Sequence, residues 1–191
     1  IWLGVSALRV YIGNRVGKTI IPMLEKAEKR IYIVSPYLSS KYARLLVNKA
    51  KQGVDVRIIT SNERMLSHQQ ALSIVLLQRG YARKAKMLLV FGIMLLILII
   101  TSIIGVILLI LALYYHRKSK NVSKIQNLSV KIPRTYIHAK IYIIDNIAIT
   151  GSANLTYAGM HKNVEIIYVW DSEANVEPHY REFNKIWETT N

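Results

Sequence analysis

Apolar residues alternate between strand-like and helix-like spacing along most of this chain. In the N-terminal part, short apolar runs predict buried strands. The segments between them place apolar residues three and four positions apart, as one face of a helix requires. Ser39 or Ser40 can cap a helix that Gly53 ends. The expected elements are strand Leu8–Ile12, helix Thr19–Lys29, strand Arg30–Ser35, a helix from Ser39 or Ser40 to Gln52, strand Val54–Thr60 and helix Ser67–Gln78.

The C-terminal part continues with strands and one long amphipathic helix. Its expected strands are Ser129–Ile132, a β-hairpin over Ile137–Thr150, and Asn163–Trp170. The last helix carries Tyr180 and Phe183 at helical spacing, with Pro178 in its first turn. Because strands and helices alternate, we expect an α/β fold with a mixed sheet.

An uncharged run of 27 residues, Met87–Leu113, interrupts this pattern. As one helix it would measure roughly 40 Å, more than a bilayer core of about 30 Å, so we assign it to a membrane. A single span would put the strands before and after it on opposite sides of the bilayer. We therefore favour a helical hairpin over 87–116, turning near Thr101 and Ser102, although a single span stays open. Residues 1–86 and 117–191 then form one interrupted domain, which the basic flanks place in the cytoplasm.

The residues with the clearest chemistry lie at the predicted β-hairpin. His138 and Lys140 are two apart, and such side chains share a face of a strand, which pairs a nucleophile or proton carrier with a cation. At the end of the hairpin, Gly151-Ser152 and Asn154 add small hydrogen-bonding groups. Phosphate chemistry uses such a set, because it needs a nucleophile, a positive charge and donors that approach closely.

The order His138-x-Lys140-x4-Asp145, then Gly151-Ser152-x-Asn154, resembles the HKD motif of the phospholipase D superfamily. The stretch of five residues between Asp145 and Gly151 is one residue shorter than in that family, which predicts a tighter hairpin. The resemblance covers nearly the whole chain outside the uncharged run. It implies a phospholipase D-like mixed-sheet sandwich, interrupted by the apolar helical hairpin.

The resemblance also implies a two-step cleavage of a phosphodiester through a phosphohistidine on His138. It makes His138, Lys140 and Asp145 the candidate catalytic set, and Lys140, Ser152 and Asn154 the candidate phosphate-binding groups. It implies no metal or other cofactor. Because Asp145 has the opposite strand parity to His138, we interpret its role within this set as structural.

The implied mechanism uses two histidines, whereas the chain carries one motif. Single-motif members of the superfamily solve this with a symmetric homodimer. Glu165 lies where the family keeps an acidic residue that binds the other imidazole nitrogen. Glu165 is therefore either this orienting residue or an ordinary strand glutamate.

The formal net charge of +15 bears on the substrate. Eight of the 26 basic residues flank the uncharged run with no acidic neighbours, as expected next to a membrane. The remaining excess suits a polyanion, so nucleic acid is the favoured substrate. A phospholipid substrate, for hydrolysis or phosphatidyl transfer, stays open, as does a catalytically silent phosphate-binding protein. The absence of cysteine excludes disulfides and thiolate metal sites.

Overall fold

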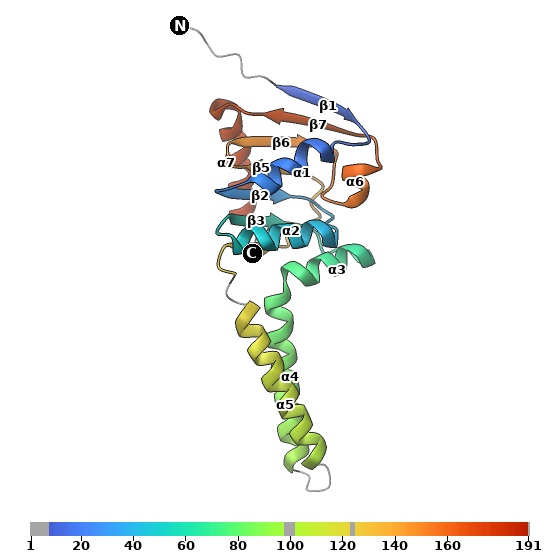
Figure 1. Ribbon diagram of the computed structural model, residues 1–191, viewed down its shortest axis with the longest axis vertical. Coiled ribbons are helices and arrows are strands. Elements are labelled where there is room, and N and C mark those ends of the chain that lie inside the picture. The colour runs from blue at the N-terminus through green and yellow to red at the C-terminus, as the bar shows by residue number, and fades with distance from the viewer. Residues whose placement is uncertain (1–7, 98–101, 123–124, 191) are drawn as a thin grey trace. The chain divides into compact units, whose positions relative to one another are not determined.

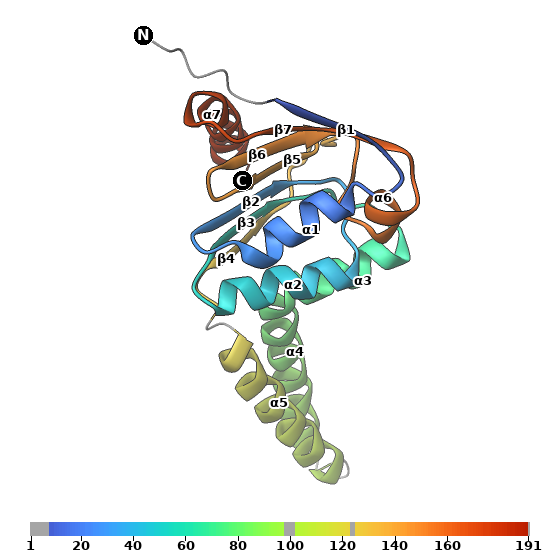
Figure 2. The same ribbon diagram turned by 45° about the horizontal axis from the view of Figure 1, so that its top comes forward.

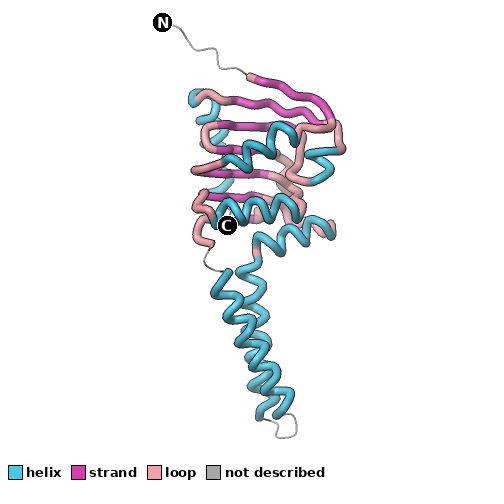
Figure 3. The backbone as a smooth tube through the Cα atoms, in the orientation of Figure 1, coloured by secondary structure: helices cyan, strands magenta, loops and turns pink. Residues whose placement is uncertain are grey.

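The computed structural model describes residues 8–97, 102–122 and 125–190, which form two compact units. The first joins the residues up to 74 with those from 126 onward, and the second comprises residues 75–125. Figure 1 traces the chain through both units. The first unit holds the described strands, whereas the second is helical (Figure 3). The expected insertion, 87–116, lies within the second unit.

The described strands of the first unit form one sheet: β1 Arg9–Gly13, β2 Arg30–Val34, β3 Asp55–Ile59, β4 Leu128–Lys131, β5 Ile141–Ile144, β6 Ile147–Gly151 and β7 Glu165–Trp170. Their order across the sheet is β1-β7-β6-β5-β2-β3-β4. β2, β3 and β4 are parallel to one another, and the other neighbours are antiparallel. The mixed sheet expected from the sequence is confirmed.

Helices cover both faces of this sheet (Figure 2). The helices of the first unit are α1 Gly17–Lys26, α2 Ser40–Lys51, α3 Leu66–Val75, α6 Tyr157–His161 and α7 Glu173–Thr189. α1 and α2 lie on one face, and α7 lies on the other. The sheet therefore has a hydrophobic core on each side, as expected for an α/β domain.

β2 shows how the sequence builds these two cores. Side chains alternate between the faces of a strand, and Tyr32 stacks on Phe183 of α7 with ring centroids 5.0 Å apart. Ile31 and Ile33 therefore point to the α1–α2 side, where both are fully buried. A strand buried on both faces appears in the sequence as a continuous apolar run, which is why β2 was predictable.

Two features of the C-terminal part differ from the sequence prediction. Pro178 lies inside α7 rather than in its first turn, because the helix already begins at Glu173. The short helix α6 was not predicted, since five residues are too few to show a helical period. Its cap is visible only in the structure, where the Thr156 hydroxyl accepts a hydrogen bond from the Gly159 N–H at 3.0 Å.

The second unit is a pair of helices, α4 Leu77–Ile97 and α5 Ser102–Val122, that lie side by side as a hairpin (Figure 1). The residues of these two helices that are described as buried are all small, namely Ala85, Ala112 and two glycines. Small residues let helix backbones approach closely. None of the helices in the described parts of the chain has the length and apolar character needed to span a membrane.

Candidate functional site

The motif residues gather at one end of the sheet. β5 begins at Ile141, which pairs with Thr150 near the end of β6. Residues 138–140 before β5 and residues 152–154 after β6 are therefore adjacent, and we call this place the motif end of the sheet. The spacing of the motif predicted positions 138 and 140 inside the strand, but both lie in the segment that leads into β5.

Lys140 is buried at the motif end, although lysine is rarely buried in proteins. The residue is 7% exposed, and its Nζ donates a hydrogen bond to the backbone carbonyl oxygen of His138 at 2.6 Å. Burial lowers the pKa of Lys140, and the nearby Glu165 carboxylate partly offsets this shift. An ammonium group that is largely buried from water interacts with a phosphate more strongly than an exposed lysine would, because the effective dielectric constant around it is lower.

His138 is exposed, and its ring contacts Tyr136. The Tyr136 hydroxyl lies 3.3 Å from Nδ1, and the two ring centroids are 5.9 Å apart. This contact is made by Nδ1, the ring nitrogen nearer the backbone, and not by Nε2. The sequence pattern did not single out Tyr136, since a tyrosine next to a motif carries no spacing signal.

Glu165 opens β7 and is also 7% exposed. Its carboxylate accepts a hydrogen bond from the Ser152 hydroxyl and another from Asn163 Nδ2, the latter at 3.1 Å. The Ser152 hydroxyl in turn accepts from the Ile166 N–H at 3.1 Å. From the sequence we expect Glu165 either to orient His138 or to be an ordinary strand glutamate. In the structure its carboxylate accepts hydrogen bonds from Ser152 and Asn163, and so holds the Ser152 hydroxyl in place.

Asn154 lies in a loop of residues 153–156, here called the asparagine loop. The backbone N–H of Leu155 donates a hydrogen bond to the Ser35 hydroxyl oxygen at 3.0 Å. The Tyr142 hydroxyl donates a hydrogen bond to the backbone carbonyl oxygen of Ala153 at 2.6 Å. Within the described residues, the Asn154 side-chain oxygen is buried without a hydrogen-bond partner. Burying an acceptor unpaired is costly, so a bound group that donates a hydrogen bond to this oxygen would stabilise the complex.

Sequence reasoning missed Ser35 and Tyr142, because both occur in or beside apolar runs that predict strands. Both are buried, and burial raises the pKa of the Tyr142 hydroxyl far above its usual value. A hydroxyl within a buried strand needs a hydrogen-bond partner, and this was the available signal. Their partner is the asparagine loop, which no local pattern reveals.

Gly151 is required by close packing at the end of β6. It pairs with Ile167 of β7, and a Cβ at this position would overlap the carbonyl oxygen of Ile166. The same carbonyl accepts a hydrogen bond from the Ser152 N–H at 3.0 Å. The glycine of the Gly-Ser pair thus lets β7 approach closely enough to hold Ser152 in place.

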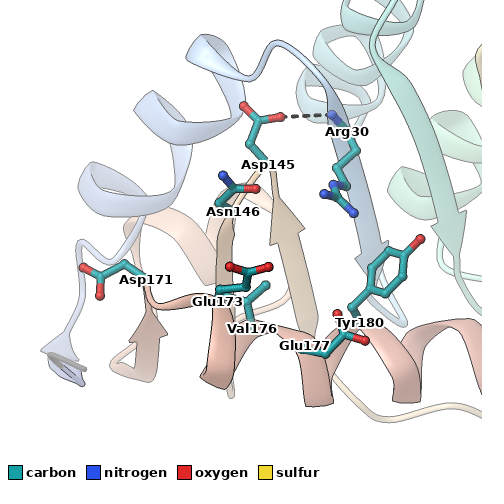
Figure 4. A pocket seen from close by; sticks show the side chains of 8 residues that line it. All are labelled: Arg30, Asp145, Asn146, Asp171, Glu173, Val176, Glu177 and Tyr180. Atoms are coloured by element: carbon teal, nitrogen blue, oxygen red, sulfur yellow. Dashed lines mark hydrogen bonds between the residues drawn. The ribbon is translucent and has the colours of Figure 1, made fainter. Parts of the chain in front are cut away.

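Asp145 lies at the opposite end of β5 from His138. It begins the two-residue β5–β6 turn with a φ of 50°, a conformation that tight hairpin turns use. Its carboxylate accepts hydrogen bonds from the backbone N–H groups of Glu28, Lys29 and Arg30 at 3.0, 2.9 and 3.0 Å. Figure 4 shows the last of these. Burial acts to raise the pKa of Asp145, but these hydrogen bonds outweigh it and the pKa is lowered. Asp145 therefore makes structural contacts and does not meet the other motif residues.

A cavity of about 300 Å³ lies beside Asp145 (Figure 4). Its walls include the carboxylates of Asp171, Glu173 and Glu177. The Arg30 guanidinium, also in the wall, lies 5.2 Å from the centroid of the Tyr180 ring. This cavity belongs to the turn end of β5, so it is separate from the candidate site at the motif end.

The motif end combines an exposed imidazole, a buried ammonium group, an oriented hydroxyl and an asparagine amide on two adjacent segments. Such groups can attack a phosphorus atom and neutralise its oxygens. Together with the mixed sheet covered by helices on both faces, they indicate the phospholipase D superfamily.

Comparison with known protein families identifies one family within the phospholipase D superfamily. Residues 20–187 match the family described as cardiolipin synthase, PLD-like domain. The match spans most of the chain, which therefore belongs to this phospholipase D-like family. No match is found among curated proteins.

Solved structures show the same fold at low sequence identity. The phospholipase D family member Nuc from Salmonella typhimurium is 17% identical, with a TM-score of 0.61 and 97% of each chain covered. NucT from Helicobacter pylori is 16% identical, with a TM-score of 0.60 and coverage of 96% of this chain and 97% of NucT. Phosphatidylserine synthase from Haemophilus influenzae is 12% identical, with a TM-score of 0.55. That match covers 97% of this chain and 39% of the synthase.

Proposed function

We propose that this protein is a metal-independent phosphodiesterase that cleaves nucleic acid through a phosphohistidine on His138. The observation that carries this proposal is the exposed His138 ring next to the buried Lys140, whose ammonium group binds the His138 backbone. In this arrangement a nucleophile and a fixed positive charge reach the same phosphate. Lysine supplies the charge stabilisation that a metal ion supplies in other phosphodiesterases.

In the first step, Nε2 of His138 attacks phosphorus, so that a P–N bond forms as the P–O ester bond breaks. The leaving oxygen takes a proton from a second histidine. In the second step, that histidine removes a proton from water, which attacks phosphorus and breaks the P–N bond. Lys140 Nζ and the Asn154 side-chain amide N–H donate hydrogen bonds to the phosphoryl oxygens throughout. The Ser152 hydroxyl, which donates to Glu165 in the isolated chain, exchanges that partner for a phosphoryl oxygen when substrate binds.

The second histidine is His138 of another copy of the chain in this proposal. Since each chain carries one motif, a symmetric dimer is needed to bring two motif ends together. The exposure of His138 supports this, because a histidine that must meet its counterpart across an interface has to lie at the surface of the isolated chain.

Nucleic acid is our preferred substrate because the first unit keeps 18 basic against 11 acidic residues. A phospholipid substrate, for hydrolysis or phosphatidyl transfer, is the alternative. It is favoured by the family description and by the likeness to phosphatidylserine synthase.

We also propose that the α4–α5 hairpin attaches the enzyme to the cytoplasmic side of a membrane. The support is compositional: residues 75–125 hold the long apolar run, eight basic residues and no acidic residue. Basic residues on both sides of the run fit an anchor that enters and leaves by the same membrane surface.

The deciding experiment compares wild type with His138→Asn on single-stranded nucleic acid and on phospholipid vesicles, both in excess chelator. We expect nucleic-acid cleavage that survives the chelator and falls by several orders of magnitude in His138→Asn. His116→Asn, which changes an exposed histidine of α5, is the matched control and should retain full activity.

Three other outcomes would each change the assignment. Turnover of vesicles alone would move the substrate to phospholipid. Activity that disappears in chelator and returns with a divalent metal would refute the metal-independent mechanism. Retention of a polyanion without turnover of either substrate would identify a phosphate-binding protein.

A further inference from the structure

We propose that the α4–α5 hairpin contains a binding groove for a single anionic phospholipid, with the acyl chain along the outer surface shared by α4 and α5 and the phosphate beside Lys84. This site is separate from the motif end and does not depend on which substrate is cleaved there. It is also more specific than membrane attachment, because it places one lipid on one side of the hairpin.

The groove has a volume of about 430 Å³, within the range of small-molecule sites in proteins. Its walls are almost wholly apolar, with Met87, Leu88 and Phe91 from α4 and Leu108 and Leu111 from α5. An open apolar groove of this kind offers dispersion contacts along its length and few hydrogen-bonding groups. Those properties match a hydrocarbon chain.

One end of the groove is polar. Lys84 and Tyr115 line this end, and the Lys84 Nζ lies 5.8 Å from the centroid of the Tyr115 ring. A phosphate next to an ammonium group gains a charge-assisted hydrogen bond. The groove therefore has the polarity of a phospholipid, with a positively charged end and an apolar body.

The packing of the hairpin explains why its large side chains face outward. The buried positions described in α4 are Ala85 and Gly92, and those in α5 are Gly105 and Ala112, so the small residues are seven apart on each helix. A Cβ at Gly92 would lie 3.4 Å from the Gly105 carbonyl oxygen, which shows how closely the backbones approach. Helix pairs with small residues inside and large apolar residues outside are typical of a lipid environment.

The outward side chains are strongly exposed in the isolated chain. Met87 is 56% exposed, Phe91 55% and Ile110 60%. A continuous apolar surface of this kind calls for an apolar partner. Lipid and a second hairpin are the two candidates, and charge distinguishes them.

Residues 75–125 carry eight basic residues and no acidic one. Packing a second hairpin against the groove would bring like charges together, which is unfavourable. An anionic lipid places a negative charge at Lys84 instead. Charge complementarity therefore favours the lipid over a second copy of the chain.

The test uses the full chain in neutral detergent with phosphatidylglycerol that carries a diazirine in its acyl chain. After irradiation, mass spectrometry should find adducts on Met87, Phe91, Leu108 and Leu111. Unlabelled phosphatidylglycerol should compete about five-fold better than phosphatidylcholine, since one lysine near an anionic lipid is worth about 1 kcal/mol. Lys84→Gln should abolish this preference.

Two matched controls keep the proposal falsifiable. Lys86→Gln removes an exposed charge of α4 outside the groove and should keep the preference for phosphatidylglycerol. Leu111→Asn should lower labelling several-fold, whereas Leu113→Asn, which lies outside the groove, should not. Equal effects within each pair would overturn the proposal, because they would show general attraction to lipid without a site. Cross-links between two hairpins in place of lipid adducts would assign the groove to a second copy.

Discussion

Asp145→Ala should destabilise the first unit through the backbone of β2. The substitution removes the carboxylate that accepts three hydrogen bonds from the N–H groups of Glu28, Lys29 and Arg30. Hydrogen bonds to a charged group contribute about 1.5–3 kcal/mol each. Two of the three are exposed, so water can replace the carboxylate there. We therefore expect a loss of about 3 kcal/mol in the free energy of unfolding, or about 10 °C in Tm.

The assay is urea unfolding of the full chain, followed by tryptophan fluorescence. Trp170 and Trp187 are both partly buried in the first unit, so they report on its unfolding. Asp171→Ala is the matched control, because it removes an exposed carboxylate whose ion pair with Arg9, at 2.9 Å, is exposed on both sides. Such a pair is worth less than about 1 kcal/mol.

Asp145→Asn should fall between wild type and Asp145→Ala. Asparagine keeps one acceptor oxygen and tolerates the positive φ of this turn position. If Asp145→Ala unfolds at the same urea concentration as the Asp171→Ala control, the carboxylate does not hold the turn as argued. If Asp145→Ala abolishes phosphodiesterase turnover in a chain of undiminished stability, Asp145 takes part in the chemistry after all.

Three further predictions address pH, the asparagine loop and the approach of β7. Because the pKa of Asp145 is lowered on folding, its contribution to stability is present above about pH 4 and lost as pH falls through the folded pKa; Asp145→Asn should flatten this acid limb in pH-dependent urea titrations. Ser35→Ala should lower the free energy of unfolding by about 1–3 kcal/mol and should lower kcat more than it changes KM, since the asparagine loop loses a hydrogen bond. Ser73→Ala, at an exposed position, should leave both unfolding and kinetics unchanged. Gly151→Ala should lower the free energy of unfolding by about 2 kcal/mol more than Gly13→Ala and should therefore melt at a lower temperature. The two glycines have similar φ values, 156° and 153°, but a Cβ at Gly151 would meet backbone atoms whereas one at Gly13 would enter open space. Equal melting temperatures would refute the close-approach argument.

The sequence predicted most strands of the sheet, because the position of a strand depends on the local spacing of apolar and polar residues. β2 contains a continuous apolar run, β3 alternates charged and apolar residues before its final isoleucines, and Asn163–Trp170 differs from β7 by two residues at one end. What local patterns do not contain is which strands become neighbours. The order that puts β7 between β1 and β6 depends on the packing of the whole sheet.

The candidate site was predictable only in part, for the same reason. His138, Lys140, Ser152 and Asn154 form a motif that is close in sequence, so their meeting at one end of a hairpin follows from the spacing. The partners Tyr136, Ser35 and Tyr142 were missed, since side-chain hydrogen bonds across the fold leave no spacing signal. Glu165 was singled out, but its hydrogen-bond partner could not be read from position along a strand.

The place of the hairpin in the chain has a consequence for how this domain can change during evolution. β3 and β4 are parallel neighbours, with Val56 paired to Leu128, and α4 and α5 lie between them in the sequence. Each doubling of a connecting loop costs only about 0.6 kcal/mol, so this crossover can gain, lose or exchange a whole module with little effect on the stability of the sheet. The cost falls on folding rate, because β4 has to find its partner across a long intervening segment. A helical module can thus be inserted into or removed from a phospholipase D-like domain at this one junction while the sheet that carries the motif is kept.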